Sequence, residues 1–322
     1  MQATTFKVRV DAVRDEAPGI RSFSIARLDG QPFGAYTPGA HIDVTAPSGI
    51  TRQYSLCGDP ERIDTQLFAV KNEPESRGGS RSLHDDVAVG SELTVGAPRN
   101  LFQLAPDARR HVLIGAGIGI TPLLSMAYRL VKLNAPFELH YFARSEAHAA
   151  FLPLLAQEPF ARHVRFHFGV TVDGLDASLA ACLANASAGT HVYTCGPAPF
   201  MDRVVAAGEA RLPADAIHLE RFAATPAASD EAALESFDVR IATTGQTVKV
   251  GKETSIVDAL AAIGIEIDTS CGEGVCGTCM IDVIEGEPEH RDHCLSKAER
   301  ASNKVICCCV SRSRSPLLVL DL

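Results

Sequence analysis

The chain has 322 residues, of which 46% are hydrophobic and 21% are charged, and its formal net charge is −9. This length suggests two or three domains, and the apolar fraction excludes wholesale disorder. The acidic balance argues against a nucleic-acid partner, because a protein that neutralises phosphates needs a basic surface. Apolar runs are far shorter than the ~20 residues that span a bilayer, and the first ten residues lack the apolar stretch of a signal peptide. We therefore expect a cytoplasmic protein without a membrane partner.

Residues 1–105 carry the sequence pattern of a β-domain. Phe6, Val8 and Val10 are apolar and the residues between them are polar, which is the period of a half-buried strand. Similar alternations recur further along, and turn sequences such as Pro38-Gly39 separate them. Short strands at this spacing predict a sandwich or barrel.

Residues 106–224 change to an alternation of strands and helices. A short apolar run from His111 ends in glycines at Gly115. Further strands are predicted over 137–142, 164–168 and 191–195, and helices over 122–132, 147–156, 177–184 and 199–211. This alternation predicts an α/β domain with a doubly wound parallel sheet.

The last part of the chain is a linker followed by a small cysteine-rich unit. Residues 225–235 are small and polar and include a proline, as linkers do. Residues 236–322 contain 9 Lys and Arg against 13 Asp and Glu, and seven of the ten cysteines. In a cytosolic chain such a cysteine cluster is more often metal-binding or catalytic than a disulfide framework.

The cysteines form a motif with a specific spacing. Cys271, Cys276 and Cys279 are spaced Cys-x4-Cys-x2-Cys, and Cys309 follows after 29 intervening residues, as in plant-type [2Fe-2S] proteins. Two irons need four thiolates, and the glycines between the cysteines let the backbone approach the cluster closely. A structural zinc site is the alternative, but zinc favours paired Cys-x2-Cys units and only one is present.

Spacing alone leaves the fourth ligand open, because Cys307, Cys308 and Cys309 are consecutive. Buried packing is an equally simple interpretation of the other cysteines in this region, including Cys294. The neighbouring His290 and His293 are interpreted as part of a polar loop.

A second motif, Arg52-Gln53-Tyr54-Ser55, has the residue types that a flavin requires. Arg52 can neutralise a phosphate, Tyr54 can lie against the isoalloxazine ring, and Ser55 can form a hydrogen bond with flavin N5. Downstream, a Gly-Gly-Ser turn that enters a short helix exposes N–H groups to an anion, although a plain flexible turn has the same sequence. This stretch contains Ala69, Val70, Lys71, Gly78, Gly79, Ser80 and Arg81, with Ser76 and Arg77 preceding the turn.

A third motif is a glycine-rich turn after the first strand of the α/β segment. Here Gly115, Gly117, Gly119, Thr121 and Pro122 open a helix whose N-terminus can receive a pyrophosphate. A second loop, Thr194-Cys195-Gly196-Pro197, ends a later strand. Cys195 can also be interpreted as a buried thiol at a strand end. Arg144 follows the strand predicted over 137–142, where a basic residue could bind a 2′-phosphate.

These motifs, in this order over essentially the whole chain, resemble the phthalate dioxygenase reductase family, including reductases of the vanillate demethylase and carnitine monooxygenase kind. The segments 285–292 and 309–322 carry further similarity. The resemblance implies an antiparallel β-barrel for the flavin domain and an α+β plant-type ferredoxin domain at the end of the chain. It implies flavin contacts within 69–71 and 78–81, FMN as the flavin, NADH as the donor, a monomer, and Cys309 as the fourth cluster ligand. It also places Cys195 beside the nicotinamide and Phe222 against the flavin ring, so the residues expected at the site of hydride transfer are Ser55, Cys195 and Phe222.

The three sites together predict an electron-transfer enzyme. NADH delivers two electrons at once, a [2Fe-2S] cluster accepts one, and a flavin can take the pair and release the electrons singly. The resemblance implies a reductase component that serves a Rieske-type oxygenase. The alternatives are a reductase for a cytochrome P450 or a diiron hydroxylase, and a non-catalytic redox sensor that binds zinc.

The acidic ferredoxin-type domain suggests how such a partner is recognised. We expect the carboxylates of Glu285, Glu287, Glu289 and Asp292 to dock on a basic surface of the oxygenase. The alternative is that these carboxylates only keep a solvated loop soluble.

Overall fold

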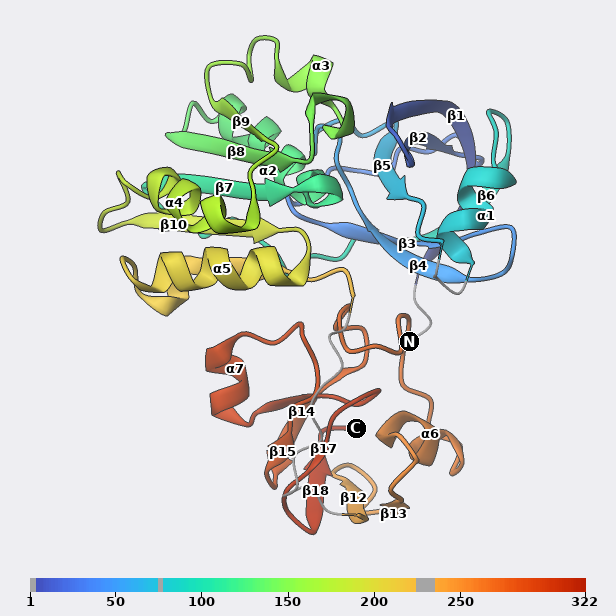
Figure 1. The fold of residues 1–322 in the computed structure, drawn as a ribbon. Coiled ribbons are helices and arrows are strands. Elements are labelled where there is room, and N and C mark those ends of the chain that lie inside the picture. The colour runs from blue at the N-terminus through green and yellow to red at the C-terminus, as the bar shows by residue number, and fades with distance from the viewer. Residues whose placement is uncertain (1–3, 75–77, 224–234) are drawn as a thin grey trace. The chain divides into compact units, whose positions relative to one another are not determined.

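The computed structural model describes residues 4–74, 78–223 and 235–322 (Figure 1). Residues 4–220 pack as one compact unit, and the described residues from Arg221 onward belong to a second. Most of the expected linker, 225–235, lies outside the described residues, as do Ser76 and Arg77. Within the described ranges, no helix has the length and apolar character needed to cross a membrane.

The first unit begins with a six-stranded sheet in which every strand pair is antiparallel. Its strand order is β4-β3-β6-β1-β2-β5, and a bridge between Leu56 and Phe68 joins the two outermost strands. The expected antiparallel β-barrel is therefore confirmed. The strands are β1 (Thr5–Ala17), β2 (Ile20–Arg27), β3 (His41–Thr45), β4 (Thr51–Ser55), β5 (Gln66–Lys71) and β6 (Glu92–Gly96), and a short helix α1 (Gly79–Asp85) lies between β5 and β6.

The barrel is filled by the alternate residues that the sequence pattern selects. Val8, Val10, Phe23 and Ile25 are fully buried, while their neighbours in sequence are mostly more exposed. The rings of Phe23 and Phe68 stack with their centroids 5.3 Å apart. The period of two in the sequence thus corresponds to the inner face of the barrel.

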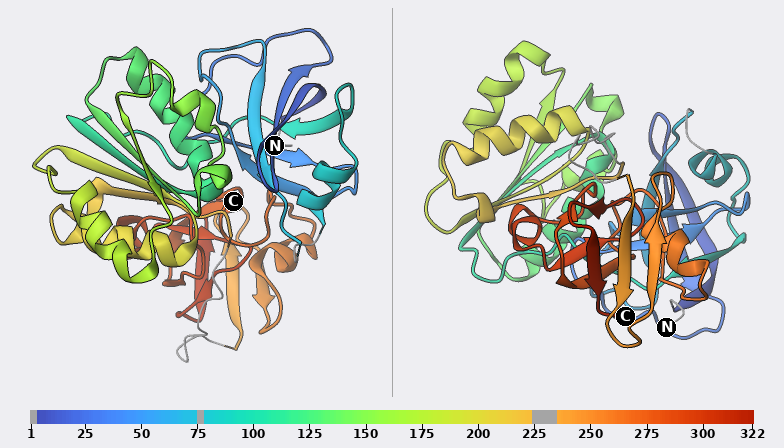
Figure 2. Two further views of the ribbon diagram at one scale, coloured as in Figure 1. Left: turned by 45° about the horizontal axis from the view of Figure 1, so that its top comes forward. Right: turned by 90° about the horizontal axis from the view of Figure 1, so that it is seen from below.

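The second part of this unit is a five-stranded parallel sheet with the order β11-β10-β7-β8-β9 (Figure 2). Helix α2 shares a core with one face of the sheet, and α4 and α5 share a core with the other, as a doubly wound fold requires. The elements are β7 (Arg110–Ala116), α2 (Ile120–Lys132), β8 (Phe137–Ala143), β9 (Val164–Phe168), α4 (Val172–Cys182), β10 (Thr190–Cys195), α5 (Ala198–Glu209) and β11 (Ile217–Glu220), with 3₁₀ turns η1 (Gly117–Gly119), η2 (Glu146–His148) and η3 (Ala214–Ala216).

Two of the helix predictions for this sheet need correction. The helix expected over 147–156 is wrong: that stretch contains the end of η2 and a single turn, α3 (Leu152–Leu155). The helix expected over 177–184 begins earlier, at Val172, because the Thr171 side chain caps it by accepting a hydrogen bond from the Gly174 N–H at 3.3 Å.

The barrel and the parallel sheet share one hydrophobic core. Ile20 and Ala69 of the barrel belong to the same buried cluster as Leu113 and Ile120 of the α/β part. The Gly39 N–H also donates a hydrogen bond to the Ser125 hydroxyl of α2 at 2.9 Å. The candidate flavin and nucleotide motifs are consequently held in one rigidly packed unit.

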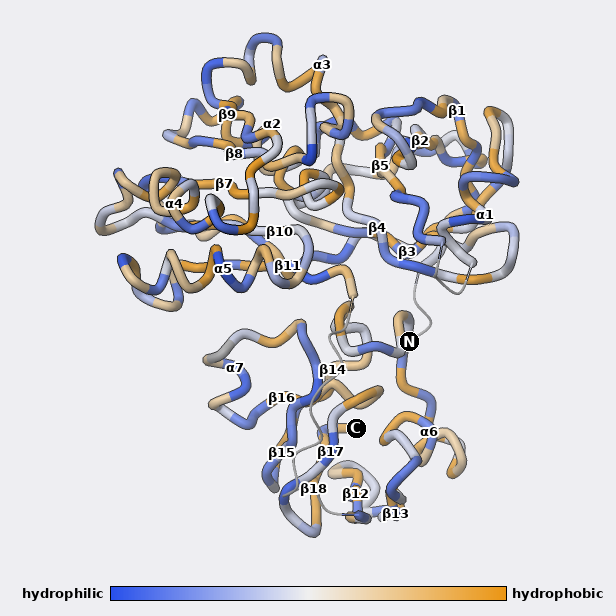
Figure 3. The backbone as a smooth tube through the Cα atoms, viewed as in Figure 1, coloured by the Kyte–Doolittle hydropathy of each residue, from blue (hydrophilic) through white to orange (hydrophobic). Residues whose placement is uncertain are grey.

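The second unit is a small mixed sheet with the order β13-β12-β18-β14-β16. Strands β12 and β18 are parallel and the other pairs are antiparallel, which confirms the expected α+β ferredoxin-type domain. Its apolar core includes Val239, Ile306 and Leu318. Hydrophobic and hydrophilic stretches follow one another along the backbone of this unit (Figure 3). The elements are β12 (Phe237–Ile241), β13 (Thr247–Val250), α6 (Ile256–Ala261), β14 (Met280–Glu285), β15 (Pro288–Glu289), α7 (Lys297–Ser302), β16 (Val305–Cys307), β17 (Arg312–Ser313) and β18 (Leu317–Leu320).

Candidate functional site

The predicted flavin motif forms most of strand β4, and Ser55 is its last residue. Ser55 is buried, and Tyr54 is half-buried with its ring centroid 5.6 Å from that of Phe68 on β5. Burial raises the pKa of Tyr54 to about 12, so its ring stays neutral. Gln53 donates a hydrogen bond to Asp43 at 2.6 Å. The motif is thus anchored on both sides by neighbouring strands.

The Gly-Gly-Ser turn lies against the same strand. Gly78 adopts φ +102°, which favours glycine, and a Cβ placed on Gly79 would lie 3.4 Å from Cγ of Arg52. Ser80 is buried, and its hydroxyl accepts a hydrogen bond from the Glu73 N–H at 3.2 Å. Arg81 is exposed and donates to the Pro74 carbonyl. The structure therefore brings the predicted phosphate-binding arginine next to the predicted anion-binding turn.

Ala69, Val70 and Lys71 lie on β5 beside this region. Ala69 and Val70 are buried, so their side chains contribute to the core, while the Lys71 side chain is exposed. A flavin would meet Ala69 and Val70 mainly through their backbone groups. These residues stay predictions as cofactor contacts.

The two predicted nucleotide loops are in direct contact. A Cβ placed on Gly119 would lie 2.2 Å from the carbonyl oxygen of Cys195, and one placed on Gly196 would lie 3.1 Å from Cβ of Ala116. Only glycine allows the glycine-rich turn and the second loop to approach this closely.

The loops meet at the carboxyl ends of β7 and β10, where Cys195 pairs with Gly115. Open parallel sheets bind ligands at this edge. Thr121 is buried and donates a hydrogen bond to the Ile118 carbonyl at 3.0 Å, while Pro197 directly precedes α5. Geometry of this kind suits a dinucleotide whose pyrophosphate faces the start of α2.

The flavin strand and the nucleotide sheet meet at Glu220, the last residue of β11. The Ser55 hydroxyl donates a hydrogen bond to Glu220 Oε2 at 3.0 Å, and Glu220 pairs in register with Cys195 of β10. Burial raises the pKa of the Cys195 thiol well above its usual value, and the Glu220 carboxylate raises it further, so Cys195 is a neutral thiol. The side chain is 0% exposed, which agrees with the alternative interpretation of a buried thiol at a strand end, and a role for Cys195 beside the nicotinamide stays a prediction.

His41 completes this junction. Its Nδ1 lies 3.8 Å from Glu220 Oε1, and its buried Nε2 has no hydrogen-bond partner among the residues that the structure describes. Among the same residues, the buried Thr194 hydroxyl, one residue before Cys195, also lacks a partner. Two unpartnered polar atoms are what a site for a polar cofactor provides. Sequence reasoning missed His41, which carries no motif, and did not select Glu220, although a carboxylate at the end of a parallel strand is a usable signal.

Phe222, which the resemblance places against the flavin ring, belongs to the second unit and is 43% exposed. Its role stays a prediction. Arg144 is exposed directly after β8, where it could reach a ribose phosphate.

The cysteines of the predicted cluster gather in one loop of the second unit. Cys271, Cys276 and Cys279 are buried, and all the cysteines are free thiols. The Glu273 N–H donates a hydrogen bond to Cys271 Sγ at 3.2 Å. Gly274 adopts φ +71° and approaches the chain after Cys309 so closely that a Cβ on it would lie 2.6 Å from Val310 Cγ2. The loop is therefore folded tightly against the C-terminal strand region.

Cys309 is distinguished from its neighbours by its contacts. Its thiol contacts both Cys271 and Cys279, and these contacts raise its pKa. Contact with Cys276 and then with Cys309 lowers the pKa of Cys271. The four predicted ligands thus lie together, which fits a four-thiolate cluster.

The remaining cysteines of this unit have other neighbours. Cys307 is fully buried against Cys279 and against Cys294, whose Sγ lies 3.2 Å from its own. Cys308 is buried and its N–H donates to the Cys279 carbonyl. Their interpretation as packing residues agrees with these positions.

The acidic segment before Cys294 differs from the expected solvated loop. Glu289 is 3% exposed and paired with Arg291, while Asp292 is 1% exposed and paired with His290 and Arg300. The expectation that these two carboxylates dock on a partner is wrong, because they are buried in internal ion pairs. Exposed carboxylates remain at Glu285 and Glu287, whose side chains are 66% and 55% exposed.

Comparison with known proteins agrees with the predicted cluster site. Residues 239–314 match the family described as 2Fe-2S iron-sulfur cluster binding domain, which favours the cluster over a zinc site. Residues 96–217 match the family described as dimethylamine monooxygenase subunit DmmA-like, N-terminal domain. The vanillate O-demethylase oxidoreductase of Pseudomonas sp. (strain HR199 / DSM 7063) is 43% identical over 317 residues, which cover 98% of this chain and 99% of that protein.

Two solved structures show the same architecture. Phthalate dioxygenase reductase, described as a modular structure for electron transfer from pyridine nucleotides to [2Fe-2S], has a TM-score of 0.70 and 32% identity over 99% of this chain and 98% of its own. An intact type IV self-sufficient cytochrome P450 monooxygenase has a TM-score of 0.89 and 38% identity over 99% of this chain, which spans only 41% of that longer one. From identity over its full length and this shared architecture, the chain belongs to the phthalate dioxygenase reductase-like family and is a flavin and [2Fe-2S] oxidoreductase of the reductase-subunit type.

Proposed function

We propose that this protein passes electrons from NADH through FMN and its [2Fe-2S] cluster to a Rieske-type oxygenase. The observation that carries the proposal is the junction at Glu220, where Ser55 of the flavin strand, Cys195 of the nucleotide loop and His41 come together. The flavin bound there would accept a hydride and release single electrons. The family resemblance supports FMN, NADH and a monomeric protein.

Within the proposed site, the protein's own groups bind and orient. The Arg52 guanidinium and the N–H groups of the Gly79 turn would hold the flavin phosphate, and Tyr54 would cover one side of the ring. The glycine-rich turn before α2 would receive the pyrophosphate of the nucleotide, while Gly196 leaves space for the nicotinamide end. The neutral Cys195 thiol would limit where the nicotinamide can lie, and this constraint aligns it for hydride transfer.

The hydrogen bond between Ser55 and Glu220 links the flavin strand to the nucleotide sheet. The Ser55 hydroxyl donates to Glu220 Oε2, and His41 Nδ1 lies 3.8 Å from the other carboxylate oxygen, Oε1. Glu220 therefore fixes the direction of the Ser55 O–H, and His41 limits the movement of Glu220.

The cofactor assignment is tested by releasing the flavin and identifying it by mass spectrometry. FMN is expected, and recovery of FAD would contradict the assignment. Stopped-flow reduction by NADH and by NADPH then identifies the donor, since faster reduction at lower concentration is expected with NADH. Size-exclusion chromatography with light scattering tests the monomer.

A second acceptor is favoured by a specific observation. Over 99% of the chain, the fold is similar to that of a self-sufficient cytochrome P450 monooxygenase, with a TM-score of 0.89. The acceptors are distinguished by comparing the rate at which the reduced protein reduces a purified Rieske oxygenase and a purified P450. A Rieske oxygenase reduced faster supports the proposal, and a P450 reduced faster contradicts it.

A further inference from the structure

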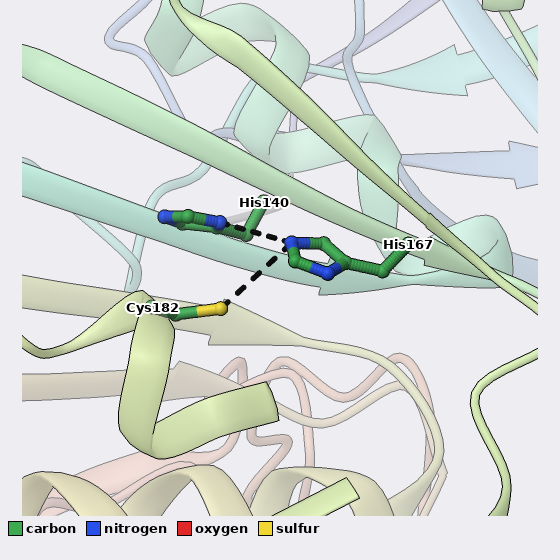
Figure 4. Close-up of side chains that lie close together, drawn as sticks. All are labelled: His140, His167 and Cys182. Carbon is green, nitrogen blue, oxygen red and sulfur yellow. Dashed lines mark hydrogen bonds between the residues drawn. The ribbon is translucent and has the colours of Figure 1, made fainter. Parts of the chain in front are cut away.

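We propose that His140, His167 and Cys182 form a binding site for one Zn²⁺ ion in the nucleotide domain, independent of the electron-transfer cofactors. The three side chains come from β8, β9 and the last residue of α4, and they point toward one another on the face of the sheet that α4 and α5 cover (Figure 4). None of the three has a role in the proposed function.

The separations of the ligand atoms suit a tetrahedral ion. His140 Nδ1 lies 3.0 Å from His167 Nε2, and Cys182 Sγ lies 3.8 Å from the same nitrogen. All three ligand atoms are within 4.8 Å of one another. With Zn–N of about 2.1 Å and Zn–S of about 2.3 Å, tetrahedral angles place two nitrogens about 3.4 Å apart and a nitrogen and a sulfur about 3.6 Å apart. The two separations at His167 Nε2, 3.0 Å to nitrogen and 3.8 Å to sulfur, differ from these by a few tenths of an ångström.

The sheet holds the two imidazoles in place without an ion. His167 lies opposite Phe142 in the β8–β9 register, and the two rings stack with centroids 4.2 Å apart and planes 7° apart. His140 lies two residues before Phe142 and so faces the same side of the sheet. Because stacking and burial restrict both rings, little rotational freedom remains to be lost when an ion binds.

A carboxylate lies behind one of the histidine ligands, as it does in many metal sites. Within the described part of the chain, the buried Nε2 of His140 has no hydrogen bond, and Glu138 Oε2 lies 3.5 Å from it. Arg110 pairs with the other oxygen of Glu138 at 3.1 Å and so holds the carboxylate. An N–H on Nε2 directed at Glu138 leaves the Nδ1 lone pair free for the ion, which is the carboxylate–histidine–zinc arrangement.

The ligand chemistry selects the ion. Two imidazoles and a thiolate are borderline-soft ligands that suit zinc, and the absence of a carboxylate from the set of three argues against magnesium and calcium. Binding displaces the thiol proton of Cys182, so each ion bound releases one proton and no electron is transferred. Water can supply the fourth ligand, since His167 is only half-buried.

The chain provides a matched control for this site. His191 Nδ1 and His218 Nε2 lie 2.9 Å apart on the neighbouring strands β10 and β11, with their rings stacked. In the part of the chain that the structure describes, no third His, Cys, Asp or Glu completes a group with this pair. A pair of histidines without a thiol should not retain zinc.

The test measures zinc in the holoenzyme. The protein is treated with a chelator, incubated with ZnCl₂, desalted, and analysed for zinc and iron by mass spectrometry and for zinc ligands by X-ray absorption. We expect about one zinc per chain beside two irons, coordinated by two imidazoles and one sulfur. Cys182→Ser should weaken zinc binding at least about tenfold and remove the sulfur signal, whereas His191→Asn should change neither.

Three results would overturn the proposal. The first is that desalted wild-type protein retains no zinc. The second is that zinc enters only as iron is lost, which would place it at the cluster cysteines. The third is that Cys182→Ser, shown by circular dichroism to be folded, keeps both wild-type affinity and the sulfur signal. If Cys182→Ser does not fold, the ligand set measured on the wild type decides, since more than one sulfur contradicts the site.

Discussion

Replacing Gly119 with alanine tests whether contact between the two nucleotide loops controls hydride transfer. The new Cβ would lie 2.2 Å from the carbonyl oxygen of Cys195, 2.3 Å from its carbonyl carbon and 2.6 Å from the Gly196 nitrogen. All three are backbone atoms, so no side chain can rotate away. Ordinary contact begins at 3.4 Å, and the loops must therefore separate by about 1 Å.

The size of the effect follows from that displacement. Overpacking of this kind costs about 1–3 kcal/mol, and backbone atoms on both sides place Gly119→Ala near the upper end. A shift of about 1 Å in a positioning group can slow a reaction about 100-fold. We expect destabilisation of about 2–3 kcal/mol in urea unfolding and a loss of about 100-fold in the rate of flavin reduction by NADH, with flavin and cluster still bound.

Gly117→Ala is the matched control. Gly117 adopts φ +56°, but a Cβ on it meets nothing within 4 Å. Alanine there adds only the strain of the left-handed conformation, about 1–2 kcal/mol, and leaves the loops in contact. The role of loop contact would be refuted if NADH reduced the flavin of Gly119→Ala at the wild-type rate. It would also be refuted if Gly119→Ala and Gly117→Ala lost the same fraction of that rate.

Three further predictions concern the cluster, the pH dependence of stability and partner docking. Cys309→Ser should abolish the cluster or change its electron paramagnetic resonance spectrum while NADH still reduces the flavin, whereas Cys308→Ser should leave the spectrum unchanged; the reverse pattern would assign the fourth ligand to Cys308. Burial lowers the pKa of His111 to about 4, so the folded state resists its protonation, and the stability this residue contributes is complete above pH ~6.5 and falls as the pH drops toward 4. Between pH 7.5 and pH 5.5, the free energy of unfolding measured in urea should therefore fall by about 1.4 kcal/mol because of this residue, and His111→Asn should remove that share of the pH dependence. An unchanged pH dependence in His111→Asn would contradict the assignment. Electron transfer to the oxygenase should slow as salt rises from 0.1 M to 1 M, because the Debye length falls from ~10 Å to ~3 Å. In the double variant Glu285→Gln with Glu287→Gln, this transfer should be slower at low salt and should depend less on salt. An equal salt dependence of the internal electron transfer from NADH would argue against electrostatic docking.

Local sequence determined the classes of structure and the chemistry of the motifs. The period of two around Phe6 and Val8, and the strand–helix alternation after His111, predicted a barrel followed by a parallel sheet, because burial of one face imposes these periods. The spacing of Cys271, Cys276 and Cys279 predicted the cluster loop, because ligands within one loop are fixed by local geometry. Local patterns failed over 147–156, where alanines suggested a helix and the chain forms only two short turns.

Only the tertiary structure decided which distant residues meet. Ser55 and Glu220 are 165 positions apart and form one hydrogen bond, and the His41 that lies beside them carries no local signal. Burial was also decided by the tertiary structure. Glu289 and Asp292 lie in a polar stretch that is typical of a solvated loop, yet both are buried in ion pairs. Contacts between distant strands depend on sheet order and packing, which no short window of sequence contains.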